Sequence, residues 1–68
     1  MQAMELFVNG EKTSIVDAAT VSELITALDI RDNVAVEINR EIVSRSAFAH
    51  HLLADGDQVE IVTAIGGG

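Results

Sequence analysis

Three segments of the chain alternate between apolar and polar residues with a period of two, the pattern of a strand that buries one face. These segments are residues 4–8, 34–38 and 58–63. In the last of them, Val59 and Ile61 are expected to face inward, and Glu60 and Val62 to face outward. The pattern therefore predicts strands near both ends of the chain and one in its middle.

Two shorter strands are expected beside these. Asn9 and Gly10 directly follow the first segment, and this pair favours a tight hairpin because both residues tolerate positive φ. A returning strand is predicted over residues 13–16. Ile42 and Val43 form a short apolar pair that predicts an edge strand.

The segment after the hairpin has the period of an amphipathic helix. Thr20 and Glu23 fit a capping box, in which each side chain bonds a free backbone amide at the start of the helix. Apolar residues then recur with helical spacing at Val21, Leu24, Ile25 and Leu28. The helix is expected to end near residue 29 or 30 and to cover one face of the sheet.

Two connecting features complete the prediction. A brief helical turn, capped by Ser44 or Ser46, is expected to stack Phe48 and Leu52 on one side. The sequence Asp-Gly-Asp at residues 55–57 predicts a turn before the last strand. The order of elements is then β-β-α-β-β-β.

This order predicts an α+β fold, the ubiquitin-like β-grasp. In this fold a mixed sheet of four to five strands carries one main helix packed on one face. The last strand is expected to pair parallel with the first, in the middle of the sheet. Residues 1–63 would form this domain, and residues 64–68 a flexible glycine tail directed away from it.

Composition narrows the possible functions. The chain has 68 residues, enough for one domain, and 49% of them are apolar, which favours a packed core over disorder. The formal charge of −7 argues against nucleic acid as a partner and favours a monomer when the protein is free. No apolar run is long enough for a membrane span, so cytoplasmic residence is expected. Cysteine is absent, so sulfur chemistry on a thiol of this chain is excluded.

The candidate chemistry lies in Gly66, Gly67 and Gly68, which a frayed end or a cloning remnant would also explain. A glycine tail has no side chains, so it can thread a narrow channel of a partner. Residues 64–68 can extend about 17 Å, which suffices to place the Gly68 carboxylate in a partner's active site. A carboxylate is inert toward nucleophiles until it is activated, and adenylation with ATP by a partner is the plausible route.

Other polar groups do not predict a site within the chain. His50 and His51 are adjacent, so on a helix they would point about 100° apart and chelate one metal poorly. Asp55 and Asp57 flank a glycine, which is typical of a turn, whereas hard cations need about six oxygens or more. We therefore expect no metal, no resident cofactor and no catalytic residues.

A docking patch is predicted on the sheet face opposite the helix. Phe7, Val62 and Ala64 should lie on this face and, with the last strand parallel to the first, should be neighbours. The acidic residues Glu5 and Glu60 would surround them. Isolated apolar residues on an ordinary surface are the alternative interpretation.

Two stretches of sequence, together with the size and the order of elements, resemble the ThiS family of sulfur carriers in thiamin (thiazole) biosynthesis. The first is Asp-Gly-Asp-Gln-Val-Glu-Ile-Val at residues 55–62, followed by the three glycines. The second is Ile-Asn-Arg-Glu-Ile-Val-Ser-Arg at residues 38–45, which contains a Val-x-Arg step. The resemblance covers residues 4–68.

The resemblance implies a reaction at the tail. An E1-like adenylyltransferase of the ThiF type would adenylate the Gly68 carboxylate with ATP. Sulfur from the persulfide of a cysteine desulfurase would convert it to a thiocarboxylate, which would deliver sulfur to thiazole synthase. The essential Gly-Gly pair of the family corresponds to Gly67 and Gly68, and the chain would be a carried substrate, not an enzyme.

Two other functions stay open at this stage. The small subunit of molybdopterin synthase shares the fold, the Gly-Gly end and the thiocarboxylate, although those chains usually run longer. A plain interaction domain with an incidental glycine tail is the alternative from a different class.

Overall fold

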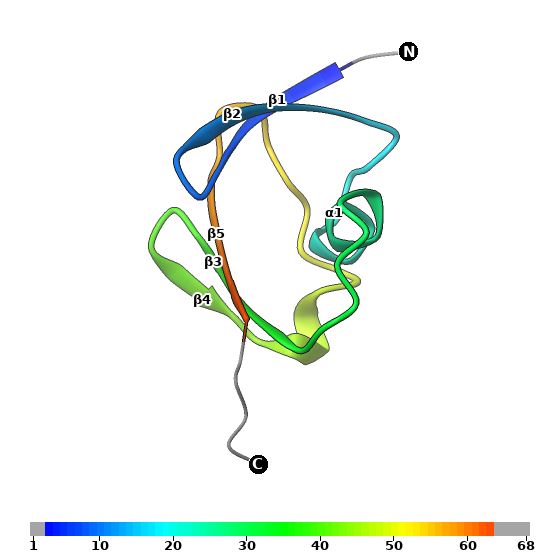
Figure 1. The fold of residues 1–68 in the computed structure, drawn as a ribbon, viewed down its shortest axis with the longest axis vertical. Helices are drawn as coiled ribbons and strands as arrows, with labels where there is room; N and C mark the ends of the chain where they lie inside the picture. Colours follow the sequence, from blue (N-terminus) through cyan, green and yellow to red (C-terminus); the bar gives the residue numbers. More distant parts are fainter. Residues whose placement is uncertain (1–2, 64–68) are drawn as a thin grey trace.

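The computed structural model describes residues 3–63, and all structural statements below concern this range. A five-stranded sheet curves around one α-helix, which covers one of its faces (Figure 1). The elements are β1 Ala3–Val8, β2 Glu11–Val16, α1 Val21–Ala27, β3 Val34–Ile38, β4 Glu41–Val43, the 3-10 helix η1 Arg45–Ala47 and β5 Gln58–Thr63. The strand order is β2-β1-β5-β3-β4.

Strand β5 occupies the centre of this sheet although it comes last in the chain. It pairs parallel with β1, and it pairs antiparallel with β3 over that strand's whole length. Strands β2 and β4 form the two edges, each through a hairpin with its neighbour. The predicted α+β fold, the parallel pairing of first and last strands and the short edge strand are all confirmed.

The core lies between the sheet and α1. Leu6 of β1 and Val59 of β5 are fully buried in its centre, as are Val21 and Leu24 of the helix. The rest of the buried cluster is Ile15, Ala18, Val34, Val36, Ile38, Val43 and Leu53. The predicted inward faces of the strands and the predicted helical stripe are therefore confirmed.

The helix begins at the predicted capping box. The Glu23 amide donates to Thr20 Oγ1 at 3.2 Å, and the Glu23 carboxylate accepts from the amides of Thr20, at 3.2 Å, and Ala19, at 2.7 Å. These bonds satisfy amides that would otherwise lack a partner at the helix start. In the described part of the chain, no helix is long and apolar enough to span a membrane.

Two boundaries differ from the prediction by two residues or more. Strand β2 begins at Glu11, two residues earlier than expected, because the Asn9-Gly10 turn is as tight as a hairpin allows. The helix ends at Ala27 and not near residue 29 or 30, since Leu28 already has non-helical angles and Asp29 has a φ of 57°.

The predicted stacking of Phe48 and Leu52 in one helical turn is wrong. Only the 3-10 helix η1 forms here, a turn over residues 48–50 follows it, and Leu52 lies in an isolated β-bridge with Thr20. Leu52 is 71% exposed, whereas Leu53 is buried. The Leu53 amide donates to the Ala19 carbonyl at 2.8 Å, which fixes this orientation.

Replacing Thr20 by alanine should destabilise the fold by about 1 kcal/mol, because the Glu23 amide loses its acceptor at the start of α1. Urea denaturation followed by circular dichroism measures this loss. Ser14→Ala, at an exposed position of β2, is the matched control and should change stability by less than about 0.5 kcal/mol. Equal stability of the two variants would contradict the capping role.

Candidate functional site

The predicted reactive residues Gly66, Gly67 and Gly68 lie outside the described residues, and so does Ala64 of the predicted patch. The site is therefore described through the strand that leads to them, β5, and through the sheet face around it. The last described residue, Thr63, lies opposite Val34 of β3.

Polar side chains fix the start of β5. One carboxylate oxygen of Asp57 accepts from the Asn39 side chain at 2.9 Å, and the other accepts from the Ala54 amide at 2.8 Å. The Asn39 side chain in turn accepts from the Gln58 amide at 3.0 Å, and the backbone amide of Asn39 donates to the Gln58 carbonyl at 2.8 Å. The Asp-Gly-Asp sequence is therefore a structural anchor, and its predicted turn is confirmed.

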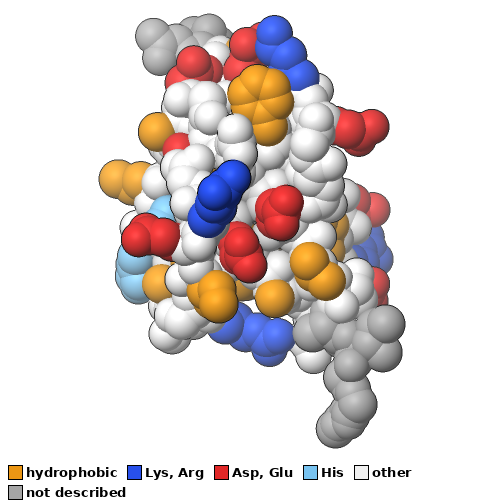
Figure 2. Space-filling view, turned by 90° about the vertical axis from the view of Figure 1, so that its left-hand side faces the viewer, with side chains coloured by type: hydrophobic (Ala, Val, Ile, Leu, Met, Phe, Trp, Pro, Cys, Tyr) orange, Lys and Arg blue, Asp and Glu red, His pale blue; other side chains and the backbone are white. Residues whose placement is uncertain are grey.

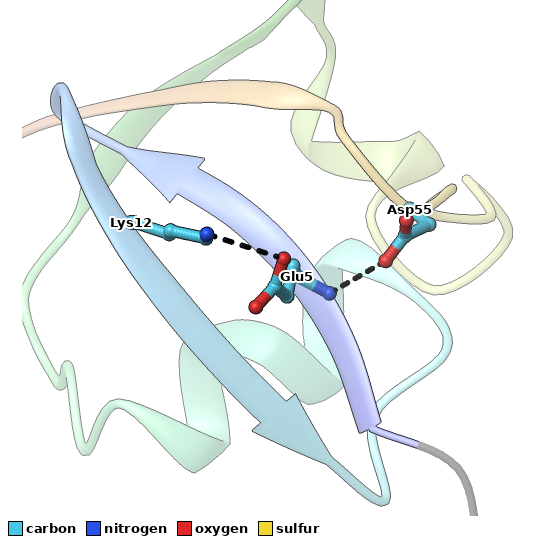
Figure 3. A network of polar contacts seen from close by, with 3 residues as sticks. All are labelled: Glu5, Lys12 and Asp55. Carbon is cyan, nitrogen blue, oxygen red and sulfur yellow. Dashed lines mark hydrogen bonds and ion pairs between the residues drawn. The ribbon is translucent and has the colours of Figure 1, made fainter.

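The same turn is tied to β1 (Figure 3). The Glu5 amide donates to Asp55 Oδ1 at 2.8 Å, and the Gly56 amide donates to the Glu5 carbonyl at 2.6 Å. On its other side, the Glu5 carboxylate lies 3.6 Å from Lys12 Nζ of β2. Both side chains of this ion pair are more than half exposed, so it contributes little. The turn is held by the two hydrogen bonds to the backbone of Glu5.

Asn9 holds β5 at a later point. Its backbone amide donates to the Val59 carbonyl at 2.8 Å. Its side chain donates to the Ile61 carbonyl at 3.2 Å and accepts from the Ile61 amide at 2.9 Å. The sequence assigned Asn9 to the hairpin turn, and its φ of 51° agrees, but nothing local indicated a partner 52 residues away.

The expectation that Phe7 and Val62 are neighbours is wrong. Phe7 lies beside Gln58 in the parallel pair, and Val62 is four residues further along β5, opposite Ala35. At about 3.3 Å per residue, this separation is roughly 13 Å. Both side chains do lie on the outer face as predicted, with Phe7 38% and Val62 60% exposed.

Acidic side chains separate these two apolar positions. Glu60 lies directly opposite Glu37 of β3, and both point away from the buried face. Ile42 of β4, which is 80% exposed, lies on the other side of Glu37. Figure 2 shows this outer face, with acidic side chains and a Lys or Arg side chain in its middle and hydrophobic ones above and below them.

Neither member of the acidic pair forms an ion pair within the described residues. The ion pairs of residues 3–63 are Lys12 with Glu5 and Arg31 with Asp29, and neither involves Glu37 or Glu60. Like charges directly opposite each other in an antiparallel pair destabilise a sheet. The sequence analysis named Glu60 but missed Glu37, Ala35 and Ile42, although the alternation over residues 34–38 already places Ala35 and Glu37 outward.

His50 and His51 follow η1 on the surface, away from any set of metal ligands. Over residues 3–63, no three His, Asp or Glu side chains come close enough together to hold a metal ion. The buried positions of this same range are all apolar.

A mixed sheet with a central last strand parallel to the first, and one helix across one face, defines a ubiquitin-like β-grasp protein. The chain belongs to the ThiS family, whose sequence model matches residues 2–68. A crystal structure of the thiamine biosynthesis protein ThiS from Geobacter metallireducens superposes with a TM-score of 0.82 at 39% identity, covering 96% of this chain and 100% of that one.

Two relatives from other bacteria differ in length. The sulfur carrier protein ThiS of Escherichia coli is 36% identical over 66 residues, which cover 96% of this chain and 100% of the relative. A thiazole synthase of Paramagnetospirillum magneticum is 44% identical over 66 residues. The match covers 96% of this chain but only 20% of that synthase, so the chain spans about a fifth of its length.

Removing one charge of the acidic pair should stabilise the protein. We expect Glu37→Gln to raise the free energy of unfolding by roughly 0.2–1 kcal/mol at low salt, because it removes the repulsion with Glu60. Urea denaturation at low ionic strength and at 1 M NaCl measures this gain, which should shrink as salt screens the charges. Glu11→Gln changes the net charge equally at another site and should give a smaller gain. An equal gain from both variants would contradict the local repulsion.

Proposed function

We propose that the chain is a sulfur carrier of thiamin biosynthesis that works through the carboxylate of Gly68. The observation that carries this proposal is the match over the whole length of a sulfur carrier protein ThiS, together with the three glycines that follow β5. The chain is not an enzyme in this role. It presents a carboxyl group to the active sites of other proteins and needs no cofactor of its own.

The reaction begins with activation. The Gly68 carboxylate attacks the α-phosphate of ATP, which releases pyrophosphate and leaves an acyl adenylate. A persulfide sulfur then attacks the acyl carbon and displaces AMP. Cleavage of the remaining S–S bond by a thiol leaves a thiocarboxylate on Gly68. Because this chain has no cysteine, every thiol that takes part in this reaction comes from a partner.

Three partners follow from this chemistry. They are an E1-like adenylyltransferase of the ThiF type that uses ATP, a cysteine desulfurase that supplies the persulfide, and a thiazole synthase that receives the sulfur. The thiazole synthase of Paramagnetospirillum magneticum supports the last of these, because a segment similar to this chain is part of it. Joining carrier and synthase in one chain raises their effective concentration for each other.

The outer face of the sheet is the proposed docking surface. It offers two apolar contacts, one at Phe7 and one formed by Val62, Ala35 and Ile42, and the acidic pair lies between them. A partner that fits this arrangement places a basic side chain between two apolar contacts. The net charge of −7 also favours a basic partner surface, because it steers such a surface toward the carrier.

Intact-mass spectrometry tests the reaction. After incubation with ATP, a ThiF-type enzyme and a persulfide donor, we expect a mass increase equal to one oxygen replaced by sulfur, located at Gly68. A variant that lacks Gly67 and Gly68 is the control and should show no increase. No increase in the wild type, with an enzyme shown to be active on a known carrier, would favour the interaction-domain hypothesis. Transfer to molybdopterin synthase and not to thiazole synthase would favour the molybdopterin pathway.

Phe7→Glu tests the docking surface. The side chain is partly exposed and lies outside the core cluster, so the domain should still fold. We expect the dissociation constant for the activating enzyme to rise roughly tenfold or more, because a charge replaces one of the two apolar contacts of this face. Surface plasmon resonance with immobilised enzyme measures it. Leu52→Glu places the same charge at an exposed apolar position outside the sheet and should bind normally. Unchanged binding of Phe7→Glu would contradict the proposal that this face is the docking surface.

A further inference from the structure

We propose that Asn9 is a positioning residue for the reaction at Gly68, because its side chain takes the place of a missing neighbouring strand beside the last part of β5. This inference rests on the proposed sulfur-carrier function. It concerns the alignment of the strand that leads to the reactive end, and it assigns Asn9 no contact with the reacting atoms.

The pairing of β5 is unequal on its two sides. On one side, β3 pairs with β5 from Val59 to Thr63. On the other side, β1 pairs with it only at Gln58 and Val59, because β1 ends at Val8 and the chain turns away. Beyond Val59, the hydrogen bonds between β5 and the β1–β2 hairpin in the described structure are the two from the Asn9 side chain to Ile61.

A carboxamide is suited to this position. Its C=O acceptor and one N–H of its NH2 group point to the same side, so a single carboxamide can bond both the N–H and the C=O of Ile61. Asparagine also tolerates the positive φ of 51° that the turn requires. An aspartate would keep the acceptor but lose the donor, and a glycine would keep the backbone conformation but lose both bonds.

The position of this bond connects it to function. Ile61 precedes Thr63 by two residues, and the residues that must enter a partner's active site follow directly. Without the Asn9 bonds, the end of β5 would be held from β3 alone. A looser strand loses more conformational entropy when the carrier docks and its end is threaded. Once the carrier is docked, the acyl carbon meets the same partner groups with or without the Asn9 bonds. The extra loss of entropy therefore weakens binding and leaves the rate of the chemical step unchanged.

The experiment compares three variants. Asn9→Gly removes both bonds at no cost in backbone strain, and Asn9→Asp retains the acceptor for the Ile61 amide. Thr20→Ala is the control, since it weakens the helix start and leaves β5 unchanged. Steady-state kinetics of thiocarboxylate formation give KM for the carrier and kcat. Amide hydrogen exchange by NMR reports the Ile61 amide without any partner.

For Asn9→Gly we expect a rise of roughly three- to tenfold in KM with kcat unchanged. The Ile61 amide should exchange roughly tenfold faster or more, while the Val36 amide stays protected. Asn9→Asp should have an intermediate KM, and Thr20→Ala a normal one. An unchanged KM for Asn9→Gly, or an equal rise for Thr20→Ala, would overturn the positioning role. If the wild type forms no thiocarboxylate, the proposed function is wrong. Separately, a normal exchange rate of the Ile61 amide in Asn9→Gly would contradict the role of the Asn9 side chain in holding β5.

Discussion

The fold depends on inserting β5 between β1 and β3. This strand contributes Val59, which is fully buried against Leu6 and the helix, so the core is complete only when the end of the chain is in place. Hydrophobic burial gives β5 its inward face, and polar side chains from distant segments fix its position along its axis. Asn39 and Asp57 hold its start, and Asn9 holds it at Ile61. The residues that carry the proposed chemistry are therefore connected to the centre of the sheet, and not to one of its edges.

Periodicity in the sequence was sufficient for the architecture. Alternation over residues 34–38 and 58–63 identified the buried face of each strand, and the stripe after Thr20 identified the helix, because burial selects side chains by the direction in which they point. The same pattern could not fix the register between β1 and β5. A shift of two residues leaves every inward side chain inward, so alternation is equally satisfied by several alignments. Phe7 and Val62 were correctly placed on one face but wrongly placed beside each other for this reason.

The polar side chains show a second limit of local patterns. Asn9 and Asn39 both have positive φ in tight turns, and this local role alone is enough to account for their presence in the sequence. Their side chains also bond residues 52 and 19 positions away, and these bonds arise only from the tertiary arrangement. For a related reason, Leu52 was wrongly expected to stack on Phe48, whereas its neighbour Leu53 is the buried residue. The choice between them depends on the local backbone conformation, and the Leu53 amide settles it by bonding the carbonyl of Ala19, just before α1.

The two faces of the sheet are built on opposite principles. The buried positions of the inner face are all apolar and favour one packed arrangement, whereas the outer face places Glu37 opposite Glu60 between separate apolar side chains. A domain of this size has little stability in reserve, and neutral residues would form the sheet better at these two positions. The repulsion is relieved when a cation approaches both carboxylates, so the outer face gains more from a basic partner than an uncharged sheet would. At the proposed docking surface, the charges that weaken the isolated domain would strengthen a complex with a basic partner, which gives a physical basis for choosing among partners that have similar apolar surfaces.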